Sequence, residues 1–128
     1  MDLKSTFKKL ILLNLLLIIT VVFFSIFLDE SEQISNFYKN QEISNFILIL
    51  YLIWLLIYFI SIFLLYKFKK IGKNLYLAFF ILSGFLVLIE GPVAIDPLIY
   101  LIDGLFMATS GAILTFLYFT PIKKDFDK

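Results

Sequence analysis

The chain has 128 residues, of which 62% are hydrophobic and 19% aromatic, and its formal net charge is +1. A soluble domain is about 45–50% apolar, and a chain this small has too little core to bury the excess. These properties exclude a soluble globular protein. They also leave no room for a membrane part beside a folded soluble domain, so we expect one membrane domain over residues 1–128. Because lipid satisfies no backbone polar groups, its fold class is all-α integral membrane.

Several residue types that build chemical sites are missing from the composition. The sequence has no Cys and no His, and all eleven basic residues are Lys. It therefore offers no thiol nucleophile, no imidazole base and no ordinary transition-metal ligands. The few Lys clusters beside apolar runs give no support to nucleic-acid binding. We expect no metal, no cofactor, no nucleic-acid partner and no enzymatic activity.

Four apolar runs predict four spanning helices, since about 20 apolar residues cross a hydrocarbon core of about 30 Å. The expected spans are about 10–28, 46–66, 75–90 and 97–120. The third run has only fifteen apolar residues before Glu90, which makes it short for the core thickness. An outer loop, 29–45, joins the first two spans.

Residues typical of helix ends flank these runs. Asp96 is placed to cap the fourth helix, with Pro97 in its first turn. Gly91 predicts the end of the third helix, because glycine tolerates a left-handed terminal conformation. Ser44 or Asn45 is expected to cap the second helix.

The lysines set the expected orientation. Ten of the eleven lie before the first span, between the second and third spans, or after the fourth. The 29–45 loop carries four acids against Lys39 alone, and the last connection has Asp96 and no base. Short loops rich in Lys stay in the cytoplasm. The sequence therefore predicts an up-down bundle of four transmembrane helices in the inner (cytoplasmic) cell membrane, with both termini cytoplasmic.

The 29–45 loop contains one short repeat. The tetrapeptide at 34–37, Ile-Ser-Asn-Phe, recurs at 43–46. The first copy would place Ile34 and Phe37 on one side of a short surface helix. A coincidence in a compositionally biased chain is the preferred interpretation over a meaningful repeat.

Two carboxylates offer the only functional lead. Asp103 lies about six residues inside the fourth span, and Glu90 ends the third. An acid within a span is costly, so it usually faces protein or water. Ser83 precedes Glu90 by seven residues and Ser110 follows Asp103 by seven, so each serine shares a helix face with its acid. An antiparallel hairpin would let these faces meet in the outer half of the bilayer.

Three interpretations of the acids stay open. In the first interpretation, Glu90 is a solvent-exposed helix end and Asp103 is a protonated acid that is hydrogen-bonded to a carbonyl or hydroxyl group. Alternatively, the two share a proton or bind a cation, with the serine hydroxyls as further oxygen ligands. The third interpretation is a buried contact with another subunit.

Polar and aromatic side chains on the first two spans complete the candidate network. Tyr51, Trp54 and Tyr58 fall within a narrow arc of the second helix, and Tyr51 stands at the level of the acids, where it can donate to them. Asn14 and Ser25 share a face of the first helix. Hydrogen bonding between helices is the expected role of both groups.

Small residues recur at intervals of about four along the fourth span. They let a neighbouring backbone approach closely, whether in this chain or in another. Leu117, in contrast, is expected to face lipid. The predicted helix-packing residues are Gly104, Ala108, Gly111 and Ala112.

The leading functional hypothesis is a small non-enzymatic subunit, scaffold or regulator, present as a homo-oligomer or within a larger membrane complex. The alternative is an oligomeric channel, or a transporter coupled to protons or cations, that uses outer-half carboxylates. The candidate proton, cation or polar-network site consists of Glu90, Asp103, Ser83, Ser110 and Tyr51.

Overall fold

The computed structural model describes residues 2–127, and every regular element within them is a helix. Two of these helices are short: α2 (Glu32–Tyr38) and α6 (Lys123–Phe126). The other four are long and apolar enough to span a membrane: α1 (Leu3–Phe27), α3 (Asn45–Tyr66), α4 (Lys70–Glu90) and α5 (Pro97–Phe119). The prediction of an all-helical fold with four helices able to span a membrane is therefore confirmed.

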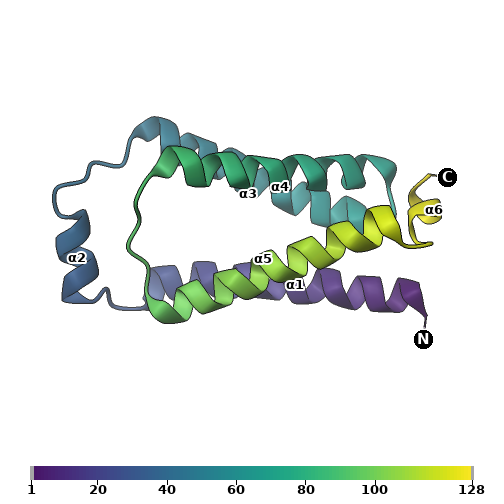
Figure 1. Cartoon of the computed structure of the whole chain (residues 1–128), viewed down its shortest axis with the longest axis horizontal. Coiled ribbons are helices and arrows are strands. Elements are labelled where there is room, and N and C mark those ends of the chain that lie inside the picture. Colours follow the sequence, from purple (N-terminus) through teal and green to yellow (C-terminus); the bar gives the residue numbers. More distant parts are fainter. Residues whose placement is uncertain (1, 128) are drawn as a thin grey trace.

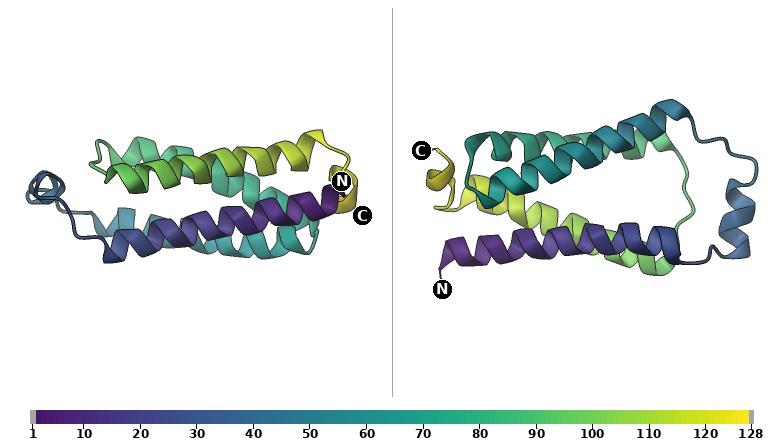
Figure 2. Two further views of the ribbon diagram at one scale, coloured as in Figure 1. Left: turned by 90° about the horizontal axis from the view of Figure 1, so that it is seen from below. Right: turned by 180° about the vertical axis from the view of Figure 1, so that it is seen from behind.

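The four long helices lie side by side as two pairs (Figures 1 and 2). The most extensive contacts join α3 to α4 and α1 to α5, so the second pair unites elements far apart in the sequence. The start of α1, the α3–α4 turn and α6 share one end of the molecule, here called the Lys-rich end. Helix α2 and the 91–96 connection lie at the other, here called the acidic end.

Helix ends occur where the sequence indicates them. The Asp96 carboxylate accepts a hydrogen bond from the Leu98 N–H at 2.8 Å and caps α5. Ser44, rather than Asn45, caps α3. Gly91 ends α4 with a φ of 75°, a backbone conformation that glycine adopts without strain.

Two helices are longer than their apolar runs. Helix α1 begins at Leu3 and α4 at Lys70, so each starts with a turn that carries lysines. Lysine is a good helix former, and its charge does not end a helix at the membrane surface. With 21 residues, α4 is about 32 Å long, so the expectation of a short third helix is wrong.

The two copies of the tetrapeptide adopt different structures. The first lies within α2, which confirms the short helix in the outer loop. The second straddles the start of α3, where Ser44 serves as the cap. The repeat therefore has no structural counterpart.

Aromatic side chains fill the Lys-rich end. The Phe7 ring lies 6.0 Å from that of Phe68 and 5.9 Å from that of Phe126, measured between centroids. Phe126 is fully buried because α6 folds back over the ends of the long helices. Around this cluster, Lys4 forms an ion pair with Asp125 at 2.8 Å. Packed side chains therefore close the Lys-rich end of the molecule.

One predicted helix face needs correction. The buried residues of α5 are Phe106, Ser110, Ile113 and Leu117, so the expectation that Leu117 faces lipid is wrong. Among the small residues, Gly104 and Ala108 are exposed, while Gly111 and Ala112 are half-buried. Apart from the adjoining residues and nearby backbone of α5 itself, no atom lies within 4 Å of a Cβ built at Gly104 or Gly111. These two glycines therefore make no close helix contact within residues 2–127.

Candidate functional site

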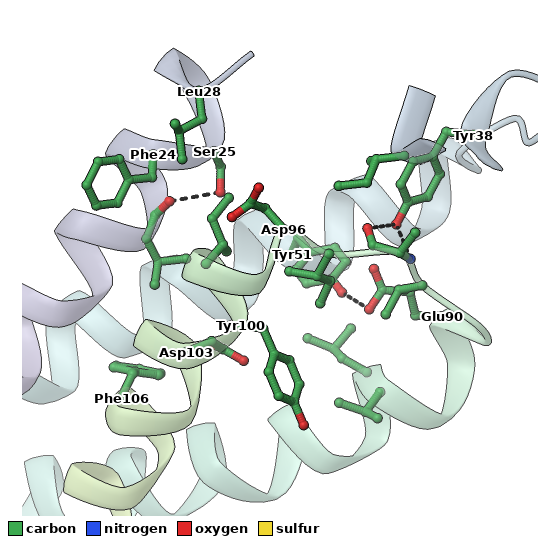
Figure 3. Close-up of a pocket in the computed structure, with 18 of the residues that line it drawn as sticks. Phe24, Ser25, Leu28, Tyr38, Tyr51, Glu90, Asp96, Tyr100, Asp103 and Phe106 are labelled. Atoms are coloured by element: carbon green, nitrogen blue, oxygen red, sulfur yellow. Dashed lines mark hydrogen bonds between the residues drawn. The ribbon is translucent and has the colours of Figure 1, made fainter. Parts of the chain in front are cut away.

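A pocket of about 550 Å³ opens at the acidic end, between the α1–α5 pair and the α3–α4 pair. Its walls come from the last turns of α1 and α4 and the first turns of α3 and α5. Helix α2 and the 91–96 connection supply the rest of its rim. Figure 3 shows side chains from these elements pointing into a common space.

The pocket concentrates negative charge. No lysine lines it among residues 2–127, although five carboxylic acids do. These acids lie in the connection after α1, at the end of α4, at the N-cap of α5 and within α5: Asp29, Glu30, Glu90, Asp96 and Asp103. A wall with these acids and without a lysine attracts cations and repels anions.

Glu90 is held by a hydrogen bond between helices. The Tyr51 hydroxyl of α3 donates to the Glu90 carboxylate at the end of α4 (Figure 3). The sequence-based expectation that Tyr51 donates to an acid is therefore confirmed. The bond fixes the Glu90 side chain on the α3–α4 side of the pocket.

Asp103 lies on the other side of the pocket. In Figure 3 its carboxylate projects from α5 into the space that Glu90 faces from α4. Within residues 2–127, Asp103 accepts no hydrogen bond and the two carboxylates do not bond to each other. The two acids thus stand at one pocket without forming a directly shared proton bridge.

The two candidate serines lie in different parts of the structure. Ser83 lines the pocket, where its hydroxyl accepts a hydrogen bond from the Trp54 indole N–H at 2.7 Å. It also donates to the carbonyl of Phe79 within α4. Ser110 lies deeper, fully buried and outside the pocket wall. Of the predicted site residues, the structure therefore brings together Glu90, Asp103, Ser83 and Tyr51.

Asn14 organises a buried polar network that joins all four long helices. Its Nδ2 donates to the Thr109 hydroxyl at 2.7 Å, the Ser110 hydroxyl at 3.0 Å and the Phe106 carbonyl at 3.1 Å. Its Oδ1 accepts from the Tyr58 and Tyr76 hydroxyls at 2.9 and 3.3 Å. We refer to Asn14 and its four side-chain partners as the Asn14 network.

The orientation of the Asn14 amide follows from its neighbours. A backbone carbonyl can only accept, so the nitrogen faces Phe106 and the oxygen faces the two tyrosines. The expectation of bonding between helices is confirmed for Asn14. It is wrong for Ser25, whose hydroxyl donates to the Val21 carbonyl of its own helix.

Aromatic rings close the floor of the pocket. Phe106 lines the pocket with 1% of its surface exposed, and its carbonyl belongs to the layer of the Asn14 network. The Trp54 ring lies 5.1 Å from Phe79, which lies 5.0 Å from Tyr58. The pocket is therefore blind toward the Lys-rich end.

Hydrogen bonds between Tyr38 and Ala94 connect the outer loop to the rim of the pocket. The Tyr38 hydroxyl donates to the Ala94 carbonyl at 2.9 Å and accepts from the Ala94 N–H at 3.0 Å. This pair of bonds ties the end of α2 to the 91–96 connection (Figure 3). Tyr38 is thereby placed in the pocket rim, a role that the sequence alone did not indicate.

Comparisons with known protein families, curated proteins and solved structures find no match for this chain. A function for it therefore rests on its own geometry. Within residues 2–127, no group of three or more acids is arranged to hold a metal ion. The pocket instead combines scattered carboxylates with aromatic walls.

Proposed function

We propose that the chain forms an up-down bundle of four membrane-spanning helices in the cytoplasmic membrane, with both termini cytoplasmic and the pocket open to the outside. The support is the lysine distribution, since nine of the ten lysines in residues 2–127 lie in segments that Figure 1 gathers at the Lys-rich end. Loops rich in Lys stay cytoplasmic. The acidic end, with the pocket, then faces outward.

Reporter fusions test this orientation. A reporter placed after Lys128, or between Lys67 and Lys73, should read as cytoplasmic. One placed within 29–45 should read as external, because that loop carries a single lysine. A C-terminal fusion active only outside would require an odd number of spans and would contradict the proposal.

The function that the geometry supports best is a non-enzymatic transporter that takes up a proton or another cation from the outside at Glu90 and Asp103. One observation carries it: both acids line a pocket of about 550 Å³ that no described lysine neutralises. Removing like charges from water is costly unless a cation accompanies them. An occupied cation site is thus the favourable state of this pocket.

The closed floor favours a carrier over an open pore. Between the pocket and the Lys-rich end lie the fully buried rings of Tyr58, Tyr76 and Phe79. A cation that enters the pocket cannot pass these rings without a movement of one helix pair against the other. Such alternating movement is the usual working principle of small membrane carriers.

Cation flux into liposomes that contain the purified protein tests this function. Asp103→Asn keeps the size of the side chain and removes its charge, so flux should fall to the rate of empty liposomes. Glu90→Gln should have a smaller effect, because glutamine still accepts the Tyr51 hydrogen bond. The matched control is Glu42→Gln, an external acid outside the pocket wall, which should leave flux unaltered.

A non-enzymatic subunit or scaffold is the second candidate, and the exposed small-residue face of α5 favours it. Gly104 makes no close helix contact within residues 2–127, and Ala108 is exposed one turn further along, so a helix of a second subunit can approach there. Equal flux for the wild type and Asp103→Asn, together with co-purification of a larger membrane protein, would support this candidate instead. A homo-oligomer that shows Asp103-dependent flux would support the transporter.

A further inference from the structure

We infer that the pocket at the acidic end binds an amphipathic organic cation, a molecule with one positive charge surrounded by apolar or aromatic groups. This inference rests on the proposed function, because it names the ligand class of the same cation site. It draws on the size of the pocket, the nature of its walls and the spacing of its acids.

The size of the pocket matches a small organic molecule. Pockets for ligands of this kind are about 300–1,000 Å³ in volume, and this one is about 550 Å³. A proton or a dehydrated metal ion would leave most of such a volume empty. The space between the helix pairs therefore suits a ligand of many atoms.

The walls of the pocket are rich in aromatic rings. Six aromatic side chains line it, and they come from four helices, α1, α2, α3 and α5. Aromatic faces attract cations with delocalised or alkylated charge, and the attraction grows when the cation loses its water. The six residues are Phe24, Tyr38, Tyr51, Trp54, Tyr100 and Phe106.

The acids are placed to attract a charge rather than to chelate a metal. No three of them cluster in residues 2–127, whereas Ca²⁺ takes six to eight oxygen ligands. Asp103 projects into the pocket without a hydrogen-bond partner among residues 2–127. Its carboxylate is therefore free to pair with the charged centre of a ligand. The absence of lysine from the described wall disfavours anions and phosphate groups.

Trp54 provides a direct readout of occupancy. It is the single tryptophan of the chain and it lines the pocket floor. A ligand in the pocket would contact its ring and change its fluorescence. Leu56 lies on the same helix with 60% of its surface exposed, so a tryptophan there would report partition into lipid instead.

The test uses the purified protein in nanodiscs of zwitterionic lipid, titrated with tetraphenylphosphonium and, separately, with tetraphenylborate. The two ions share size and shape and differ in the sign of their charge. We expect tetraphenylphosphonium to quench Trp54 with saturation and tetraphenylborate to give no saturable signal. Asp103→Asn should weaken the binding of the cation by about tenfold, through loss of a charge pair in a partly desolvated site.

The matched control is the double variant Trp54→Phe, Leu56→Trp. It should respond to both ions without saturation, because its tryptophan faces lipid. Equal saturable responses of Trp54 to both ions, or an affinity unaltered by Asp103→Asn, would overturn the inference. If Trp54 does not respond while cation flux still depends on Asp103, the ligand class is wrong and the transporter stands. If both fail, both proposals fall.

Discussion

Asn14→Leu is expected to lower the free energy of unfolding by about 2–4 kcal/mol, because it leaves several buried polar groups without partners. The variant removes the acceptor of the Tyr58 and Tyr76 hydroxyls. Both tyrosines are fully buried, so water cannot replace the lost acceptor. Leucine also removes the donor to the Thr109 and Ser110 hydroxyls and places methyl groups against these polar atoms.

Substitutions that remove fewer hydrogen bonds of the network should lower the free energy of unfolding by less. Thr109→Val removes one hydrogen bond to Asn14 from a half-buried hydroxyl, and about 0.6 kcal/mol is typical of such bonds in membrane proteins. Thr20→Val is the matched control, since its hydroxyl bonds only to the Leu16 carbonyl of its own helix. It should leave stability unchanged.

These differences are measured by unfolding the purified protein with a denaturing detergent. The loss of the helical circular dichroism signal monitors the unfolding. The expected order of stability is wild type and Thr20→Val highest, Thr109→Val lower and Asn14→Leu lowest. If Asn14→Leu unfolds at the same detergent concentration as wild type, the network contributes nothing to the joining of the four helices. That outcome would contradict a central role of Asn14 in helix packing.

The long helices and their ends were predictable because local properties determine them. Lipid requires each crossing segment to satisfy its own backbone, so an apolar run of sufficient length becomes a helix. Caps such as Asp96 and stops such as Gly91 act within one turn of their own position. The starts of α1 and α4 were missed because lysines continue a helix beyond the apolar run that hydropathy detects.

The side-by-side arrangement of the helices was not predictable from hydropathy. In a soluble protein the apolar face points inward, but in a membrane the outer surface is apolar too. Leucine therefore occurs on both sides of α5, and the burial of Leu117 could not be recognised from its type. The polar residues Asn14, Tyr58 and Ser110 carry the information instead, since each avoids lipid.

Most residues of the candidate site were predictable, but which of them lie together at the pocket was not. Helical spacing placed Ser110 on the face of Asp103, yet Asn14 from α1 binds that serine. Nothing in the sequence shows that α1, rather than α4, packs most extensively on α5. The contribution of α2 and Tyr38 to the pocket rim likewise depends on a contact between segments 56 residues apart.

Among the glycines, Gly72 has the closest neighbours, because the α3–α4 turn brings it against the end of α3. Phe68 adopts a left-handed conformation with a φ of 53°, and the Lys69 N–H bonds to the Leu64 carbonyl at 2.9 Å. These features bring the first turn of α4 against the last turn of α3. A Cβ built on Gly72 would lie 2.7 Å from the Cβ of Leu64 and 2.8 Å from the nitrogen of Leu65.

Gly72→Ala should therefore lower the free energy of unfolding by about 1–3 kcal/mol, because the obstructing atoms belong to backbone and Cβ positions that cannot rotate away. The matched control is Gly84→Ala in the same helix, where no atom lies within 4 Å of an added Cβ. That variant should be neutral or more stable by up to about 1 kcal/mol, since alanine is the better helix former. Detergent unfolding of the two variants beside wild type measures the contrast. Equal stability of Gly72→Ala and Gly84→Ala would mean that α3 and α4 do not approach each other closely at this turn.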